Sequence, residues 1–285
     1  MTKHLVSIND LSKKELLAML SLAQQFKKSP NSDCLAGKVS ANCFFEPSTR
    51  TRLSFETAAK KLGAQVIGFS DATSTSAQKG ECLTDTIQVI AQYADMIILR
   101  HPEAGAAKSA AAVSRVPVIN AGDGSNEHPT QTLVDLFSIL ETQGTVEGLK
   151  IAIVGDLCYG RTVHSLVQAL QQFDNTLYQV PAGELALPES VAVPTLQSLD
   201  DVISEVDIVY MTRIQQERLQ GEQSDPVVLT KALAGKMKAS ARILHPLPRR
   251  DELPMSIDAL KQAYYFQQAG NGVPVRQAVL ATLFV

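Results

Sequence analysis

The sequence predicts an α/β protein with two doubly wound parallel-sheet domains that are joined by interdomain helices. Its 285 residues suffice for two domains that each bury a core. Short apolar segments alternate with helical patterns along the whole chain. These segments are mostly apolar along their length, as strands of a parallel sheet covered on both faces are. We place one domain at residues 1–143, with a C-terminal helix at about 272–285 packing back onto it, and the other at 144–271.

The first half of the chain is predicted to begin with a helix. Ser12 and Glu15 form a capping-box pattern ahead of apolar residues at helical spacing. Apolar segments predict strands at 39–45, 66–69, 96–99 and 116–119. Helical patterns follow them at 51–62, 83–94, 103–113 and 130–140.

The second half repeats the alternation after a glycine-containing break. Strands are predicted at 151–154, 177–180, 206–211 and 243–244, with a helix at 162–171. A last helical stretch at 276–284 ends the chain.

The composition and net charge of the chain indicate which classes of partner it can bind. With a net charge of −3, the chain lacks the surplus of positive charge that a bulk nucleic-acid partner requires. Its apolar segments are all shorter than the roughly 20 residues of a membrane-spanning helix, and charges interrupt its first 20 residues, so we expect neither membrane insertion nor a secretory signal. Four widely spaced cysteines form no metal-ligand pattern. We therefore expect a cytoplasmic protein without structural zinc. Nothing else in the sequence points to a metal or an organic cofactor.

Polar and cationic residues follow six of the predicted strands. Ligands of open parallel sheets bind beyond the carboxyl ends of the strands, so these positions are informative. They carry Ser48, Thr49, Arg50, Thr51 and Arg52; Arg100 and His101; His128 and Gln131; Arg161; Arg213 and Gln215; and the segment HPLPR. Such a local excess of positive charge predicts a polyanionic small molecule bound between the domains.

The segment Ser48–Arg52 is the sharpest of these signals. A strand ends before it and a helix begins near Thr51, so backbone N–H groups at a helix start can bind an anion. Hydroxyl groups add donors, and Arg50 can bind two phosphate oxygens at once. The alternative is a helix cap by Ser48 or Thr49 with solvated arginines. The five other strand ends favour phosphate binding.

Two further segments carry candidate residues. Gln131 follows His128 by three positions, so both side chains could reach one carbonyl group. His101 and His245 each precede proline and could be structural hydrogen-bonding residues. Residues 71–86 form a long polar loop in which Lys79 could close over an anion, or could be a solvated lysine.

Nucleotide binding is the main alternative from the residues themselves. The segment GDLCYGRT follows a predicted strand and opens a helix, so it nearly matches the phosphate-binding loop of nucleotide enzymes. Arg161 stands where that loop requires lysine, and a broad guanidinium does not replace a compact ammonium. The dinucleotide pattern GxGxxG is absent from the sequence.

Five motifs in order then resemble the aspartate carbamoyltransferases of the aspartate/ornithine carbamoyltransferase superfamily, over nearly the whole chain. They are FEPSTRTRLSFE, GSNEHPTQTLVDLF, the GDLCYGRTVHSL segment, TRIQ and HPLPR. The first two are shared with ornithine carbamoyltransferases, whereas HPLPR favours aspartate. A transferase acting on another amino acid and a catalytically dead scaffold protein are the competing hypotheses. A dead homologue should have lost Arg50, His128 or one of the aspartate arginines, all of which are present.

The resemblance implies a role for each site residue. Residues 1–143 would bind carbamoyl phosphate, its phosphate held by Ser48, Thr49, Arg50, Thr51 and Arg100. Its carbamoyl group would contact His128, Gln131 and the main chain of Leu247 and Pro248. Residues 144–271 would bind aspartate through Arg161, Arg213 and Gln215.

The resemblance also implies partners. Ser76 and Lys79 would reach the site of a neighbouring subunit, so a homotrimer is expected, with a larger assembly containing regulatory or other pathway chains possible. The loop at 71–80, the stretch at 174–200 and the loop after Arg218 are shorter than in the best-known bacterial members. These departures lie in or beside the aspartate side of the site.

Overall fold

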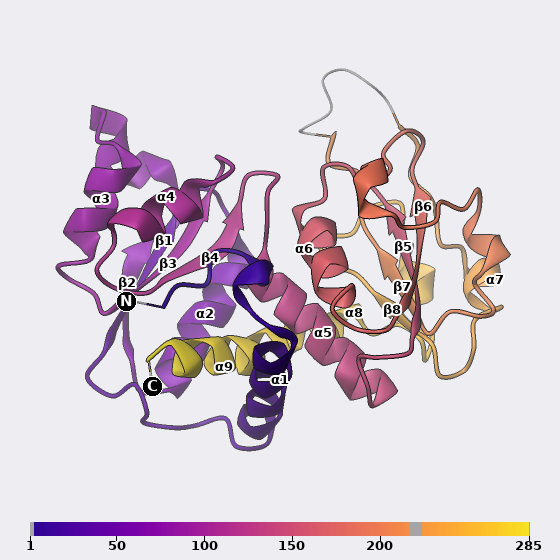
Figure 1. Ribbon diagram of the computed structural model, residues 1–285, viewed down its shortest axis with the longest axis horizontal. Helices are drawn as coiled ribbons and strands as arrows, with labels where there is room; N and C mark the ends of the chain where they lie inside the picture. Colours follow the sequence, from indigo (N-terminus) through magenta and orange to yellow (C-terminus); the bar gives the residue numbers. More distant parts are fainter. Residues whose placement is uncertain (1–2, 217–223, 285) are drawn as a thin grey trace. The chain divides into compact units, whose positions relative to one another are not determined.

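The computed structural model describes residues 3–216 and 224–284 of the chain. It divides into two compact units (Figure 1). Unit 1 comprises Met1–Phe137 and Asn271–Val285, and unit 2 comprises Ser138–Gly270. Helix α5, Pro129–Gln143, begins in unit 1 and ends in unit 2. The loop after Arg218 begins outside the described residues.

Unit 1 contains a parallel four-stranded sheet in the order β2-β1-β3-β4. Its strands are β1 (Val39–Phe44), β2 (Gln65–Phe69), β3 (Met96–His101) and β4 (Val118–Asp123). The inner strands β1 and β3 are almost entirely buried, because helices cover both faces of the sheet. The register sets Phe44 beside Arg100, so the ends of β1 and β3 meet at one edge.

The helices of unit 1 lie on both faces of its sheet, as the predicted doubly wound fold requires. They are α1 (Lys13–Lys28), α2 (Thr49–Lys61), α3 (Leu83–Ile90), α4 (Ala106–Val113) and α9 (Gly272–Phe284). Figure 1 shows α3 and α4 on one face, and α2 with α9 on the other. The predicted capping box is present, since Ser12 accepts a hydrogen bond from the N–H of Glu15 at the start of α1.

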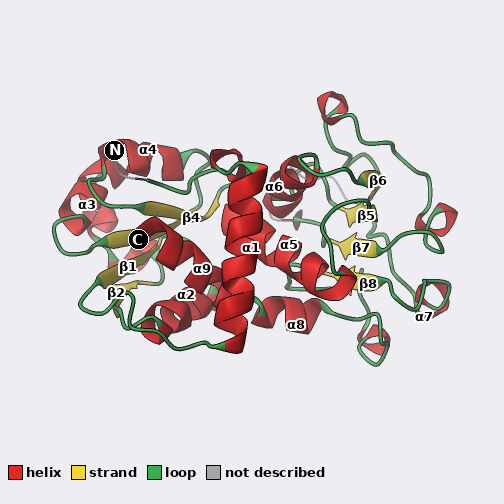
Figure 2. Ribbon diagram, turned by 60° about the horizontal axis from the view of Figure 1, so that its bottom comes forward, coloured by secondary structure: helices red, strands yellow, loops and turns green. Residues whose placement is uncertain are grey.

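Unit 2 contains a second parallel sheet in the order β6-β5-β7-β8 (Figure 2). Its strands are β5 (Lys150–Gly155), β6 (Thr176–Pro181), β7 (Ile208–Met211) and β8 (Arg242–Leu244). Its helices besides the end of α5 are α6 (Arg161–Leu170), α7 (Lys231–Ala234) and α8 (Tyr265–Gly270). Two buried parallel sheets with flanking helices confirm the predicted fold class.

Several element bounds differ from those predicted by periodicity. Strand β3 continues through Arg100 and His101, which makes Arg100 a strand residue rather than a loop residue. Helix α2 begins at Thr49 instead of near Thr51, and α3 ends at Ile90 because residues 91–94 form turns. Helices α7 and α8 were not predicted, since four and six residues are too few to show a helical period.

Across the described residues, the structure contains no helix with the length and apolar character needed to cross a bilayer.

Gly155 ends β5 at a close approach between two backbones. A Cβ atom at this position would lie 2.2 Å from the carbonyl oxygen of Thr212, and the φ angle is +115°. Only glycine combines that backbone conformation with such a contact. The position therefore fixes how closely the loops after β5 and β7 can approach each other.

We expect Gly155→Ala to lower the free energy of unfolding by about 3 kcal/mol or more, because backbone atoms must move to admit the methyl group. Gly148→Ala is the matched control in the same unit. Its φ is +72° and nothing lies within 4 Å of the added carbon, so it should cost only about 1 kcal/mol. Urea unfolding of the two variants measures the difference, and equal losses would contradict the assigned contact.

Candidate functional site

The first candidate residues lie where β1 leads into α2. Ser48 occupies the N-cap position, yet within the described chain its side chain makes no capping hydrogen bond. The first backbone bond of α2 runs from the Arg52 N–H to the Ser48 carbonyl oxygen. Thr49, Arg50 and Thr51 therefore occupy the first turn, at the positive end of the helix dipole. The arrangement favours an anion site over the alternative of a side-chain cap.

Arg52 differs from its neighbours in this segment. Its Nε lies 2.8 Å from the Glu56 carboxylate, one turn along the surface of α2. Of the two roles considered for the arginines of this segment, that of a surface residue rather than a phosphate ligand therefore fits Arg52. Thr51, by contrast, is only 6% exposed.

Arg100 reaches the same edge of the sheet from β3. Its side chain is buried, and it donates hydrogen bonds to the carbonyl oxygen of Ala121 at 3.2 Å and to the carboxylate of Glu46 at 3.3 Å. Glu46 is the second residue after β1 and lies two residues before Ser48. The guanidinium is therefore held beside the loop that carries the hydroxyl groups.

His128 and Gln131 lie at the start of α5. His128 is buried and directly precedes the first helical residue, Pro129. The Nε2 of Gln131 donates to Asp135, one turn along the helix, at 2.7 Å. This hydrogen bond orients the amide, because the remaining polar atom of Gln131 is then a carbonyl oxygen that can accept from an N–H donor.

A buried arginine lies among α2, α5 and α9. Arg276 on α9 packs over the ring of Phe55 at 5.0 Å and is 3% exposed. Burial lowers the pKa of Arg276 to about 10, although the charge of Asp135 acts in the opposite direction. The guanidinium therefore remains charged at neutral pH, close to the carboxylate that orients Gln131. Sequence analysis missed this pair; a single charged residue in an otherwise uncharged final helix was the available signal.

We call Ser48, Thr49, Arg50, Thr51, Arg100, His128 and Gln131 the unit 1 set. All of them follow or end the strands β1, β3 and β4, which are neighbours in the sheet. Ser76 and Lys79 also belong to unit 1 and lie in a short 3-10 helix, Ser76–Lys79. Both are exposed, and in the described chain neither forms a hydrogen bond or ion pair with a member of the unit 1 set.

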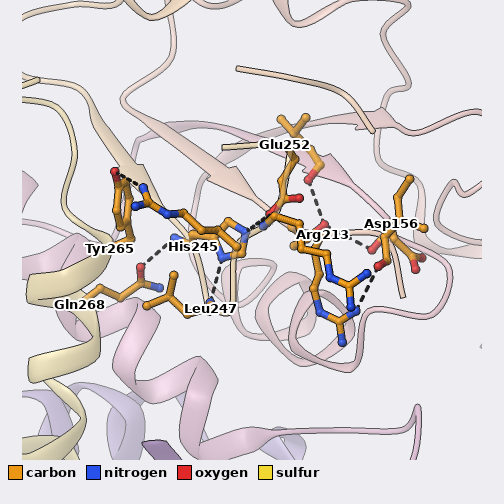
Figure 3. A network of polar contacts seen from close by, with 12 residues as sticks. Asp156, Arg213, His245, Leu247, Glu252, Tyr265 and Gln268 are labelled. Atoms are coloured by element: carbon orange, nitrogen blue, oxygen red, sulfur yellow. Dashed lines mark hydrogen bonds and ion pairs between the residues drawn. The ribbon is translucent and has the colours of Figure 1, made fainter. Parts of the chain in front are cut away.

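In unit 2, Asp156 joins the loops that follow β5 and β7. Its carboxylate is fully buried and accepts the backbone N–H groups of Tyr159 at 2.9 Å and Gln215 at 3.0 Å. Arg161 begins α6 and is buried, whereas Arg213 lies in the second loop and donates to the carbonyl oxygen of Ile214. Figure 3 shows Asp156 and Arg213 side by side. Sequence analysis missed Asp156, although a carboxylate directly after a buried strand could have indicated it.

The same contacts weigh against nucleotide binding at GDLCYGRT. In a phosphate-binding loop the backbone N–H groups surround the phosphate. Here the N–H of Tyr159 is taken by the Asp156 carboxylate, whose negative charge would repel a phosphate. The near match in sequence is therefore not a nucleotide site.

The HPLPR segment follows β8 and completes the unit 2 candidates. The peptide bond between Leu247 and Pro248 is cis, and Leu247 has a φ of +56°. His245 is buried and contacts Glu252, Gln268 and the backbone of Leu247 (Figure 3). We call Arg161, Arg213, Gln215, Leu247 and Pro248 the unit 2 set.

Both predicted structural histidines form hydrogen bonds. His101 accepts the N–H of Glu103 at its Nδ1 atom, just as His245 accepts the N–H of Leu247. Within the described residues, no three His, Cys, Asp or Glu side chains gather in a way that could hold a metal ion.

Two family models match the chain, one in each half. Residues 3–141 match the carbamoyl-P binding domain of aspartate/ornithine carbamoyltransferases, and residues 147–283 match the Asp/Orn binding domain. The chain belongs to the aspartate/ornithine carbamoyltransferase family. The resemblance inferred from five short motifs is thereby confirmed.

Individual relatives of the family are similar over their full length. The chain is 51% identical to the aspartate carbamoyltransferase catalytic subunit of Chromobacterium violaceum, covering 98% of this chain and 97% of that protein. The catalytic subunit of M. jannaschii aspartate transcarbamoylase is 46% identical, with a TM-score of 0.90 over 99% of this chain and 98% of that one. Aspartate transcarbamoylase from Trypanosoma cruzi in complex with carbamoyl phosphate is 33% identical, with a TM-score of 0.93. The match covers 99% of this chain and 95% of that one.

The buried carboxylate of Glu252 predicts an acid-dependent loss of stability. Burial alone would raise the pKa of Glu252, but hydrogen bonds from His245 and the Arg250 N–H outweigh it and hold the pKa below its ordinary value of 4.5. The carboxylate therefore contributes stability that is fully present above pH 4.5 and is lost as the pH falls through the lower folded-state value. We expect Glu252→Gln to lose less free energy of unfolding on acidification from about pH 6 than the wild type does.

Chemical unfolding at a series of pH values measures this slope. Glu189→Gln is the control, because Glu189 is an exposed carboxylate of the same unit. A Glu252→Gln protein whose stability falls with pH as steeply as that of the wild type would contradict the assigned interaction.

Proposed function

We propose that the protein transfers the carbamoyl group of carbamoyl phosphate to the amine of L-aspartate, giving N-carbamoyl-L-aspartate and phosphate. This is the committed step of de novo pyrimidine biosynthesis. The observation that carries the proposal is the gathering of cations, hydroxyls and amides at the strand ends of both units, in a chain of this family. Relatives named as aspartate carbamoyltransferases at 51% and 46% identity support aspartate rather than ornithine as the acceptor.

In this proposal, the unit 1 set binds carbamoyl phosphate. The hydroxyls of Ser48, Thr49 and Thr51 and the guanidinium groups of Arg50 and Arg100 bind the phosphate. This role is supported by the start of α2, where N–H groups and the helix dipole favour an anion.

The carbamoyl group has donors on one side and an acceptor on the other. His128 faces its oxygen, while the carbonyl oxygen of Gln131 accepts from its NH2 group, as the hydrogen bond to Asp135 favours. Main-chain groups of Leu247 and Pro248 complete these contacts.

In unit 2, aspartate is bound through its two carboxylates. Arg161 and Arg213 supply positive charge and Gln215 supplies an amide, and arginine suits carboxylates because its planar fork can donate two parallel hydrogen bonds. The loops that carry these residues are tied together by Asp156. Lys79 would add a further cation for aspartate.

The reaction follows from these residue types. The neutral amine of aspartate attacks the carbamoyl carbon, and a tetrahedral intermediate forms with a negative oxygen. Arg50, Thr51 and His128 donate hydrogen bonds to that oxygen, and Arg50 also stabilises charge developing on the phosphate. The carbon–oxygen bond to phosphate then breaks, and the departing phosphate accepts the amine proton. Most of the rate enhancement comes from holding two anionic substrates in the reactive orientation.

We infer a cytoplasmic homotrimer as the working unit, with Ser76 and Lys79 serving the site of a neighbouring subunit. The exposure of both residues in unit 1 supports this role. A larger assembly with regulatory or other pathway chains is compatible with the relatives, which are named as catalytic subunits. The four widely spaced cysteines support a reducing compartment.

The proposal is tested by offering carbamoyl phosphate with aspartate or with ornithine and detecting the carbamoylated product. Product with aspartate alone is expected. Product with ornithine would leave the phosphate assignment in place and overturn the roles of Arg161, Arg213 and HPLPR. No product with either amine, from a folded protein, would favour the scaffold hypothesis.

Two arginine variants should separate the two substrates. Arg50→Ala is expected to reduce kcat by about 1,000-fold, because it removes charge stabilisation in the transition state. Arg213→Ala should raise the KM for aspartate far more than the KM for carbamoyl phosphate, since Arg213 is assigned to a carboxylate. Steady-state kinetics with each substrate varied in turn measure both effects. Equal changes in the two KM values for Arg213→Ala, or near wild-type turnover for Arg50→Ala, would contradict the assignments.

A further inference from the structure

Three His-Pro pairs occur in the chain, and their histidines share one local geometry. In each pair the Nδ1 atom faces the residue two positions later. His101 accepts the N–H of Glu103 at 3.1 Å, His245 accepts the N–H of Leu247 at 2.8 Å, and His128 lies 3.4 Å from the hydroxyl of Thr130. Of the three, His245 has the most complete set of partners, and the proposed reaction gives its side chain no task.

The contacts of His245 fix its tautomer. Nδ1 accepts a backbone N–H, so it carries no proton. The proton of the neutral ring is therefore on Nε2, which lies 2.9 Å from the Glu252 carboxylate and donates to it. Both ring nitrogens are thus used, and the ring is buried.

Further hydrogen bonds hold this pair in place. The His245 N–H donates to the side-chain oxygen of Gln268 on α8 at 2.8 Å. The Glu252 carboxylate also accepts the Arg250 N–H at 2.8 Å, and the Glu252 carbonyl accepts the N–H of Leu229. Figure 3 shows the ring of His245 between Glu252 and the Leu247 backbone.

Leu247 has an unfavourable backbone conformation that these hydrogen bonds stabilise. Its φ of +56° lies in the left-handed region, which residues with a Cβ atom seldom adopt. Its N–H donates to the imidazole, which holds the residue in this uncommon conformation. The direction of its carbonyl group is set by the same backbone.

We propose that His245 is a positioning residue for carbamoyl transfer: oriented by Glu252, its Nδ1 atom holds the Leu247 backbone in the conformation that presents its carbonyl to the carbamoyl group. The inference rests on the proposed function, in which the main chain of Leu247 contacts carbamoyl phosphate. His245 itself touches no substrate in this account. Its effect on the reaction is transmitted through one backbone hydrogen bond.

Two substitutions separate the functions of the two ring nitrogens. In His245→Asn, the side-chain oxygen takes the place of Nδ1 and can still accept the Leu247 N–H, but the donor to Glu252 is lost. In His245→Gln, the side-chain nitrogen takes the place of Nε2 and can still donate to Glu252, but the acceptor for Leu247 is lost. Each variant thus keeps one of the two hydrogen bonds.

We expect His245→Gln to lower kcat/KM for carbamoyl phosphate by about 10- to 100-fold, since misplacement of a contact group by about 1 Å has effects of this size. His245→Asn should stay within a few-fold of the wild type. If His245 had only a structural role, both variants would lose activity in proportion to their loss of stability. Equal losses in kcat/KM for the two variants would overturn the proposal.

A stability control uses Gln179 on β6, whose buried side chain donates to the Val193 carbonyl and accepts the Leu187 N–H. Gln179→Met removes two buried hydrogen bonds of unit 2 without altering HPLPR. The variant should have a lower midpoint temperature of thermal unfolding than the wild type. Assayed well below that temperature, it should retain the wild-type kcat/KM. Activity that follows the unfolding midpoint across all three variants would contradict a positioning role.

The tautomer gives a second readout that needs no activity. The chain contains five histidines, and the 15N NMR signals that disappear in His245→Asn identify the ring of His245. In the wild type, the chemical shifts of these signals should show an unprotonated Nδ1 and a protonated Nε2. The opposite tautomer would overturn the proposal. A wild-type protein that makes no carbamoyl aspartate, yet shows the expected tautomer, would reject the proposed function while leaving the hydrogen-bond assignment intact.

Discussion

Parallel pairing of buried strands is the constraint on which both sets of site residues depend. A parallel sheet places the carboxyl ends of all its strands at one edge, and because helices cover its faces, ligands bind beyond those ends. In unit 1 this brings Arg100 on β3 beside the loop that follows β1. In unit 2 it brings the loops after β5 and β7 together, close enough that Gly155 and Thr212 leave no space for a Cβ atom. The apolar core therefore determines where the cations gather.

Buried carboxylates then fix the loops at those edges. Asp156 binds two backbone N–H groups from separate loops, Asp135 orients Gln131, and Glu252 holds His245. A buried carboxylate is costly to desolvate, so each is stable only because hydrogen bonds satisfy its oxygens. These hydrogen bonds restrain the residues that they join, so neighbouring donors keep their directions before substrate arrives. Much of the order at the site thus comes from residues assigned no contact with substrate.

The sequence allowed prediction of what depends on local pattern. Apolar segments indicated the strands, Ser12 and Glu15 indicated the start of α1, and cationic residues after strands made Arg50, Arg161 and Arg213 candidate site residues. Asp156 was missed because its partners Tyr159 and Gln215 lie in different loops, which only the folded sheet brings together. Arg276 and Asp135 were missed for the same reason, and α8 because six residues show too little periodicity. Long-range contacts and very short helices therefore escaped prediction, whereas the strands and the longer helices did not.

The central claim is that carbamoyl phosphate is bound mainly by the unit 1 set and aspartate mainly by Arg161, Arg213 and Gln215 of unit 2. Amide hydrogen exchange followed with carbamoyl phosphate alone, and then with aspartate in addition, tests it most directly. Carbamoyl phosphate should slow exchange at Ser48–Thr51, and aspartate should add protection at Gly155–Arg161 and in the segment after β7 that carries Arg213 and Gln215. Protection of those unit 2 segments by carbamoyl phosphate alone, with residues 48–51 unchanged, would contradict the assignment.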